Sequence, residues 1–186
     1  MRFLAVTAAF AVLLTAASAD ARPASSGPYA EFGIGGTSFI GDQSDNAALG
    51  VAGNIHVGLD LFSWFSIGGR VGLSSHEATV PPPPEGEYFQ LYHAAAEARI
   101  TVRYEWFAAH ISGSFGGALL STNVLEKVDV VGPGERFASH ITAGGGIEYQ
   151  LQNRHYAFGI AGEWATMPGF ASTQTASGRL YMRYTY

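Results

Sequence analysis

The chain has 186 residues, of which 47% are hydrophobic and 13% are charged, with a formal net charge of −5 at pH 7 and no cysteine. This length suits one domain, and high hydrophobicity with few charges excludes intrinsic disorder, which requires the reverse. The lack of cysteine excludes disulfides and thiolate chemistry, and the acidic balance without a cluster of Lys and Arg argues against nucleic acid as a partner.

The first predicted element is an export signal. Arg2 gives a short basic start, residues 3–14 are apolar, and an Ala-Ser-Ala sequence ends at Ala19, which are the three parts of a secretory signal peptide. The apolar run is too short to cross a bilayer core of ~30 Å comfortably. We expect cleavage after Ala19, with an alternative site after Ala21. The predicted organisation is a signal peptide (1–19), a short leader (20–28) and one β-barrel domain (29–186).

After the leader, the sequence alternates between apolar and polar residues in eight segments. Successive side chains of a strand point to opposite faces, so each segment predicts a strand with one apolar and one polar face. No segment has the period of an amphipathic helix, and no later apolar run is long enough for a transmembrane helix. The predicted strands cover residues 29–40, 49–61, 65–75, 88–104, 107–120, 137–150, 155–166 and 175–186.

Alternation alone does not say which face points into the barrel. A soluble, lipocalin-like barrel places the apolar face inside, whereas a membrane barrel places it outside against lipid. The connections favour the membrane arrangement, because short turns at one end and long loops at the other are typical of outer-membrane barrels. The predicted short turns are 62–64, 105–106 and 151–154, and the predicted long loops are 41–48, 76–87, 121–136 and 167–174.

Aromatic residues also favour a membrane barrel, because they gather near the strand ends as in the interfacial girdles of such proteins. The set near the short turns is Tyr29, Phe62, Trp64, Phe65, Tyr104, Trp106, Phe107, Tyr149, Tyr156, Tyr184 and Tyr186. A looser set near the long loops is Phe39, Tyr88, Phe89, Tyr92, Phe137 and Trp164. We therefore predict an all-β fold, an eight-stranded antiparallel up-and-down transmembrane β-barrel.

The polar face of the strands carries equal numbers of acidic and basic residues. A charge in a confined interior is costly unless it is paired, so this balance predicts a lumen filled by ion pairs. Eight strands leave an interior just wide enough for side chains, with narrow water-filled gaps beside inward glycines, so we predict a plugged barrel and no solute pore. The predicted structural network is Glu31, Asp60, Arg70, Glu97, Arg99, Arg103, Glu148, Glu163, Arg179 and Arg183.

His110-Ile111-Ser112 is the feature to weigh for catalysis, since a hydroxyl needs a nearby base to become a nucleophile. Both polar residues share the lumen-facing parity, whereas acyl chains of a lipid substrate lie outside the barrel. We therefore interpret them as part of a lumenal hydrogen-bond network. His93 and His140 show no metal-ligand spacing. The prediction is a protein that is not an enzyme, with no catalytic residue, no metal and no cofactor.

The predicted long loops carry eight acidic and two basic residues. Such loops bind divalent cations that bridge neighbouring lipopolysaccharide, bind a protein partner, or are simply solvated. The run Pro81, Pro82, Pro83 and Pro84 predicts a stiff polyproline segment and is the candidate partner loop, with a spacer as the alternative. Apolar residues at 124–125, 128 and 130–131 suggest a segment that packs on the barrel mouth or on another protein.

The last eight residues resemble the closing strand of bacterial outer-membrane barrels, and this resemblance implies that they form the signal read by the barrel-assembly machinery. The whole segment from residue 29 to residue 186 is similar to small OmpA/OmpX-like barrels, which implies contact with outer-membrane lipid and lipopolysaccharide. The C-terminal assembly signal consists of Leu180, Met182, Tyr184 and Tyr186.

A narrower resemblance is to CglE-like outer-membrane proteins of adventurous gliding motility. It rests on residues 88–93, 120–126, 153–159, 167–170 and 181–186. It implies a non-enzymatic envelope component that works with other envelope or motility proteins. The competing functions are a lipid-modifying outer-membrane enzyme and a lipocalin-like soluble ligand carrier.

Overall fold

The structure is a computed structural model that describes residues 26–79, 85–121, 126, 134–152 and 155–186. The expected signal peptide, most of the expected leader, the run Pro81–Pro84 and the apolar residues at 124–125 and 128–131 lie outside the described residues. The predictions made for them stay predictions.

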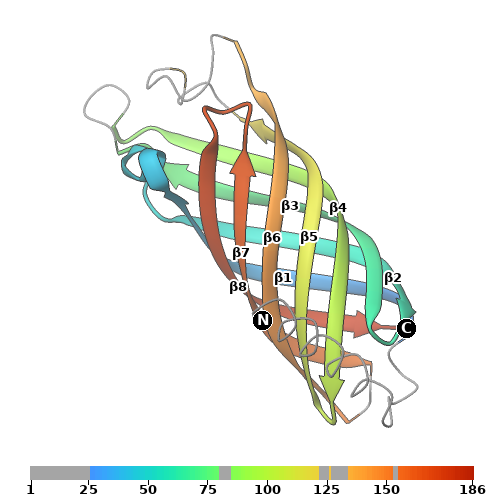
Figure 1. Cartoon of the computed structure of the whole chain (residues 1–186). Helices are drawn as coiled ribbons and strands as arrows, with labels where there is room; N and C mark the ends of the chain where they lie inside the picture. The colour runs from blue at the N-terminus through green and yellow to red at the C-terminus, as the bar shows by residue number, and fades with distance from the viewer. Residues whose placement is uncertain (1–25, 80–84, 122–125, 127–133, 153–154) are drawn as a thin grey trace, which may run out of the picture.

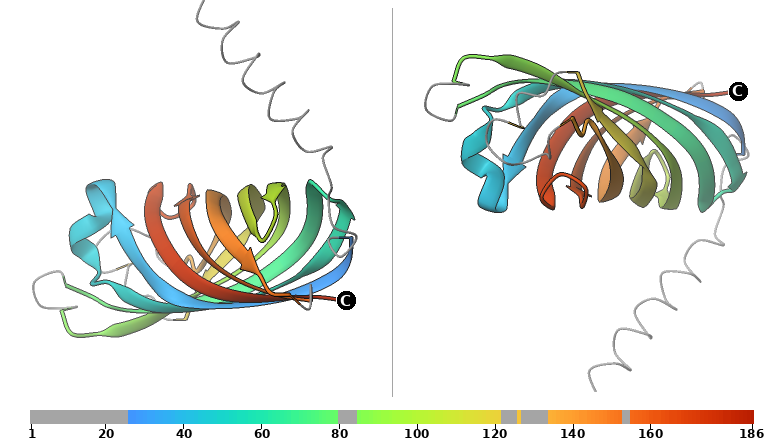
Figure 2. Two further views of the ribbon diagram at one scale, coloured as in Figure 1. Left: turned by 90° about the horizontal axis from the view of Figure 1, so that it is seen from below. Right: turned by 90° about the horizontal axis from the view of Figure 1, so that it is seen from above.

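Eight antiparallel strands close into one barrel, in which each strand pairs with its neighbours in sequence and β1 pairs with β8 (Figure 1). The predicted eight-stranded architecture is confirmed. Seen from below and from above, the same strands curve round the barrel (Figure 2). The strands are β1 (Gly27–Ile40), β2 (Gly50–Phe62), β3 (Phe65–Glu77), β4 (Tyr88–Tyr104), β5 (Phe107–Leu120), β6 (Phe137–Gln150), β7 (Tyr156–Met167) and β8 (Thr173–Thr185).

The predicted strand bounds are close to those observed. β4, β5 and β6 have the predicted bounds, and β1 begins at Gly27, two residues before the predicted start of the barrel domain. β3 continues to Glu77 and so includes His76, which the sequence analysis placed in a loop. A short 3-10 helix, η2 (Gly41–Asn46), occupies a predicted loop. With six residues, this helix is too short to show a helical repeat of apolar residues in the sequence.

The connections follow the predicted alternation in part. The connections β1–β2 (which includes η2), β3–β4, β5–β6 and β7–β8 share one end of the barrel, which we call the long-loop end (Figure 1). The start of β1, the end of β8 and the connections β2–β3, β4–β5 and β6–β7 lie at the other end, the short-turn end. The β7–β8 connection is shorter than predicted, because the strands extend to Met167 and restart at Thr173. Thr173 closes this turn by donating from its backbone N–H and its hydroxyl to the carbonyl of Phe170.

Through the middle of the barrel, large apolar side chains point outward and charged side chains point inward. Leu180 of the closing strand is 63% exposed, whereas Arg99 in the lumen is 1% exposed. The outward set is dominated by Ile, Val, Leu and Phe. Eight of the ten predicted network residues are buried in the inward set, and the other two, Arg103 and Glu163, are half-buried. This distribution is the reverse of a soluble barrel, so the lipocalin-like alternative is wrong.

Three of the aromatic residues assigned to the girdles lie inside the barrel instead. Tyr29, Phe39 and Phe89 are buried, because each shares the parity of the lumen-facing residues on its strand. Most of the remaining set is exposed on the outside, as at Tyr104, Phe107 and Phe137. No helix within the described residues is long and apolar enough to cross a membrane.

Inward glycines make room for large rings. A Cβ at Gly58 or Gly68 would lie within 3 Å of the Tyr29 ring, and a Cβ at Gly159 would lie 2.3 Å from the ring of Tyr181. The expectation of water-filled gaps beside these glycines is therefore wrong, since aromatic side chains from neighbouring strands fill the space. Close packing of this kind leaves little free volume in the interior.

Candidate functional site: the lumen and the surfaces of the barrel

Six alternating charges form a closed circuit in the lumen, which we call the charge ring. Five strands contribute to it, so the circuit ties together segments that are far apart in the sequence. In order round the circuit the members are Arg99, Glu31, Arg179, Glu163, Arg70 and Glu97.

Arg99 is the most enclosed part of the charge ring. Its Nη1 donates to Glu31 Oε2 at 2.9 Å and its Nη2 donates to Glu97 Oε1 at 3.1 Å. His56 of β2 faces the same two carboxylates, with its Nδ1 3.9 Å from Glu31 and 3.5 Å from Glu97. Charge-assisted hydrogen bonds of this kind are about twice as strong as neutral ones, and here they link β4 to β1.

The other half of the charge ring spans the lumen between β3, β7 and β8. Both terminal nitrogens of Arg70 donate to the carboxylate of Glu163, and Arg70 Nη1 also lies 3.4 Å from Glu97. Arg179 lies 3.6 Å from both Glu163 and Glu31. Each charge therefore has two opposite neighbours, which is the arrangement that offsets the cost of burying ions.

The remaining four network residues lie toward the short-turn end as two separate pairs. Arg183 Nη2 donates to both carboxylate oxygens of Asp60 at 2.5 and 2.7 Å, and its guanidinium lies 3.8 Å from the centre of the Tyr29 ring. Arg103 Nη1 lies 3.4 Å from Glu148 Oε1. The structure therefore brings all ten predicted residues into the lumen, as one ring and two pairs.

An apolar cluster fills the lumen at the long-loop end, and we call it the apolar plug. This cluster was not predicted from the sequence. Its members lie near strand ends or in the connections, where the lumen-facing residues are apolar instead of polar. Phe89 and Leu120, at the ends of β4 and β5, are fully buried. The cluster consists of Phe39, Ala47, Ala78, Phe89, Leu91, Ala118, Leu120, Ala138, Met167 and Phe170.

Phe170 enters the apolar plug from the β7–β8 turn. The next two residues, Ala171 and Ser172, have φ values of 45° and 55°, a left-handed conformation that costs free energy in residues other than glycine. Burial of the Phe170 ring in the barrel mouth is the packing gain that offsets this cost. His76 closes the plug from below, stacked 5.5 Å from the Phe89 ring.

Between the charge ring and the apolar plug lies a cavity of about 40 Å³. His93, His140, Arg70, Glu163 and Arg179 contribute to its wall. A volume of this size holds about one or two water molecules, so it is no passage for a solute. The lumen is otherwise occupied by the charge ring below and the apolar plug above.

The candidate catalytic residues His110 and Ser112 lie on the lumen side of β5. The His110 ring is buried against Tyr181, with ring centres 6.1 Å apart. Its two nitrogens have no hydrogen-bond partner within the described residues, so the predicted hydrogen-bond network does not include this ring. The polar contact on this face is instead made by Ser114, whose hydroxyl lies 2.8 Å from that of Thr142.

Metal binding has no support in the described part of the chain, where no three His, Asp or Glu side chains are grouped so as to hold an ion. Two imidazoles, those of His93 and His140, stack in the lumen with ring centres 5.1 Å apart. The His93 Nε2 atom lies against the backbone of Gly72, where a Cβ would meet it at 2.5 Å.

The predicted assembly signal lies on the outer face of β8. Leu180, Met182 and Tyr186 are exposed, and Tyr184 packs between the rings of Tyr156 and Tyr186, at 4.8 and 4.7 Å between ring centres. These positions form one apolar row on the closing strand. That the barrel-assembly machinery recognises these residues stays a prediction.

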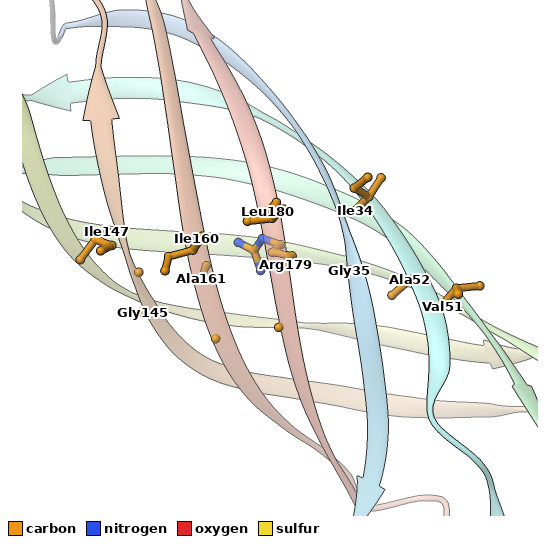
Figure 3. A pocket seen from close by; sticks show the side chains of 13 residues that line it. Ile34, Gly35, Val51, Ala52, Gly145, Ile147, Ile160, Ala161, Arg179 and Leu180 are labelled. Carbon is orange, nitrogen blue, oxygen red and sulfur yellow. The ribbon is translucent and has the colours of Figure 1, made fainter.

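The outer face also carries a shallow apolar groove of about 1060 Å³ across β6, β7, β8 and β1 (Figure 3). Its floor is made of glycines on adjacent strands, since Gly145 pairs with Gly162 and Gly162 pairs with Gly178. A parallel row of bulky residues forms one wall: Ile147, Ile160, Leu180 and Ile34 are successive cross-strand partners. The groove is part of the apolar outer surface.

A closed barrel with an apolar outer surface and an ion-paired interior defines a class of protein. The sheet has no open edge, because β1 pairs with β8, which is the condition for spanning hydrocarbon, and the outward residues are those that lipid favours. The protein is a transmembrane β-barrel of the outer-membrane type.

Comparison with known proteins gives the family. Residues 6–181 match the outer membrane protein beta-barrel domain, and the chain belongs to this family, whose place is the bacterial outer membrane. No curated protein sequence matches the chain.

Several solved structures share the fold at low sequence identity. Neisserial surface protein A is 11% identical, with a TM-score of 0.63 over 86% of this chain and 97% of that one. OprG from Pseudomonas aeruginosa is 9% identical, with a TM-score of 0.56 over 87% and 97%. The attachment invasion locus protein Ail of Yersinia pestis is 13% identical, with a TM-score of 0.53 over 86% and 99%. These likenesses concern the fold alone.

Proposed function

We propose that the protein is a non-enzymatic structural and interaction component of the outer membrane, held there by its barrel and acting through its long-loop end. The observation that carries this proposal is the filling of the lumen by the charge ring and the apolar plug. A barrel whose interior is occupied by side chains offers neither a channel nor a lumenal ligand site. The surfaces left for function are the loops and the membrane-facing wall.

The position of His110 and Ser112 supports a role without catalysis. Both side chains share the lumen face of β5, whereas the exposed neighbour Ile111 points to the membrane. An acyl chain of a membrane lipid reaches Ile111 and does not reach the hydroxyl of Ser112 through the wall of the barrel. General-base activation also needs the two groups within hydrogen-bond reach, and the His110 nitrogens have no such partner among the described residues.

The long-loop end supports binding of a partner by charge. Glu77, Glu85 and Glu87 follow one another at the β3–β4 connection, beside the proline run, and Asp42 and Asp45 lie in η2 at the same end. Acidic groups at this position suit divalent cations that bridge lipopolysaccharide, or a basic partner protein. The resemblance to gliding-motility proteins adds the finer proposal that the partners belong to a surface-motility complex.

The test is complementation of a strain that lacks the gene. The wild type and the double variant His110→Ala/Ser112→Ala are expected to restore the envelope phenotype equally and to leave the lipid A mass profile unchanged. A variant with Glu77, Glu85 and Glu87 all changed to Gln is expected to assemble normally and to fail in complementation. A lipid A profile that depends on His110 or Ser112 would instead establish a lipid-modifying enzyme.

A further inference from the structure

We propose that His93 and His140 form an acid-sensitive latch in the lumen, in which protonation of the two rings loosens the long-loop half of the barrel. This goes beyond the proposed function, because it assigns the barrel a response to the acidity of its surroundings. The proposal rests on the geometry of the two rings, on the charges around them and on the cavity that they line.

The two rings meet across one intervening strand. His93 belongs to β4 and His140 to β6, and their ring centres lie 5.1 Å apart with an angle of 25° between the planes. On β5 between them, Ala118 is the partner of His93 and Gly116 is the partner of His140. These small residues leave room for the rings to stack. Two positive charges at this separation would repel strongly in a confined interior.

The surrounding charges cannot neutralise a protonated pair. The cavity beside the rings is lined by Arg70 of β3, Glu163 of β7 and Arg179 of β8. The carboxylate of Glu163 is already engaged by both arginines. The His93 Nε2 and His140 Nδ1 atoms have no hydrogen-bond partner within the described residues. Two protons would therefore add two positive charges to a site that already has two cations and one anion.

The other histidines near this site have different surroundings. His56 of β2 faces the carboxylates of Glu31 and Glu97. His76 of β3 lies under the apolar plug, where its ring nitrogens contact the Ser74 hydroxyl and the carbonyl of Ala48 at 2.9 and 3.1 Å. Neither histidine stacks on a second imidazole. Of these rings, His56 is the control, since it also lies in the lumen and has carboxylate neighbours in place of a second imidazole.

The direction of the pH effect follows from proton linkage. In the unfolded chain each histidine is solvated and binds a proton independently with a pKa of about 6.5, whereas in the folded barrel two protonated rings would repel each other 5.1 Å apart. Below about pH 6.5 the unfolded chain binds more protons than the folded one, so the free energy of unfolding falls as the pH falls. Above that pH the rings are neutral in both states and the latch is closed. By about pH 5.5 the unfolding equilibrium constant rises roughly tenfold for each histidine.

The experiment is urea unfolding of the full barrel in phosphatidylcholine bilayers, at about pH 8 and about pH 5.5, followed by tryptophan fluorescence. From the higher to the lower pH, the unfolding constant of the wild type is expected to rise roughly 100-fold more than that of His93→Gln/His140→Gln. Contributions from all other groups are common to both proteins and cancel in this comparison. His56→Gln leaves the stacked pair intact and is expected to lose none of the pH dependence of the wild type.

A second variant keeps the test decisive if the double variant does not fold. His93→Phe removes one titrating group and keeps a ring packed against Gly72, where a Cβ would meet the His93 ring at 2.5 Å. Its pH dependence is expected to be roughly tenfold smaller than that of the wild type. The latch is disproved if either variant shows the pH dependence of the wild type, or if His56→Gln loses as much of it as the double variant does.

Discussion

Replacing Arg99 with alanine is expected to lower the free energy of unfolding by about 3–5 kcal/mol, because it leaves buried carboxylates without their shared cation. Arg99 is 1% exposed and donates to both Glu31 and Glu97. Without it, Glu31 keeps only Arg179 at 3.6 Å and Glu97 keeps only Arg70 at 3.4 Å as arginine partners among the described residues. The measurement is urea unfolding of the refolded barrel at neutral pH.

Arg103→Ala is the matched control for this substitution. Its side chain is 18% exposed near the short-turn end, and it lies 3.4 Å from Glu148, which also accepts a hydrogen bond from the Tyr181 hydroxyl. Partial solvation reduces the cost of losing an ion pair, so we expect a clearly smaller effect. Equal unfolding midpoints for Arg99→Ala and the wild type would contradict the ion-paired lumen.

Replacing Phe89 with alanine is expected to cost about 3–5 kcal/mol, as large-to-small changes of a fully buried aromatic ring do. Phe89 has no exposed surface and lies against Phe39 and His76, with ring centres 6.0 and 5.5 Å away. The cavity left by the ring cannot be refilled by the plug residues, which are themselves enclosed by the barrel wall. The same urea titration measures the loss.

Phe137→Ala provides the comparison at the same end of the barrel. Phe137 is 70% exposed on the outer face of β6, where lipid replaces the contacts that the ring makes. We expect the midpoint to change much less than for Phe89→Ala. If the two variants lost the same stability, the apolar plug would have no special role in holding the long-loop end together.

The strands and the direction of their faces could be predicted from the sequence because both depend on local alternation. β4 shows this best: its outward and inward positions alternate along all seventeen residues, its inward face is charged or polar in the middle of the strand, and the predicted bounds are the observed ones. The lumenal charges followed from the same parity. A period of two, repeated eight times with short turns between alternate strands, leaves few other architectures.

The charge ring and the apolar plug could not be predicted because they depend on registers between strands that are distant in sequence. Glu163 and Arg70 are 93 residues apart, and no local pattern assigns them to each other. Phe39 and Phe89 were assigned to an aromatic girdle because aromatic residues are common there. Each lies inside the barrel because it occupies a lumen-facing position of its strand. An aromatic residue type favours a position near the membrane–water interface, but the alternation along the strand decides whether the ring lies inside or outside the barrel.

The direct test of the membrane barrel is cell fractionation followed by electrophoresis of the protein with and without boiling. The account predicts recovery in the outer-membrane fraction and a band whose mobility shifts on heating, because a closed sheet with all its strand edges paired stays folded in cold detergent. A protein found in the soluble periplasmic fraction, with one mobility before and after heating, would contradict it.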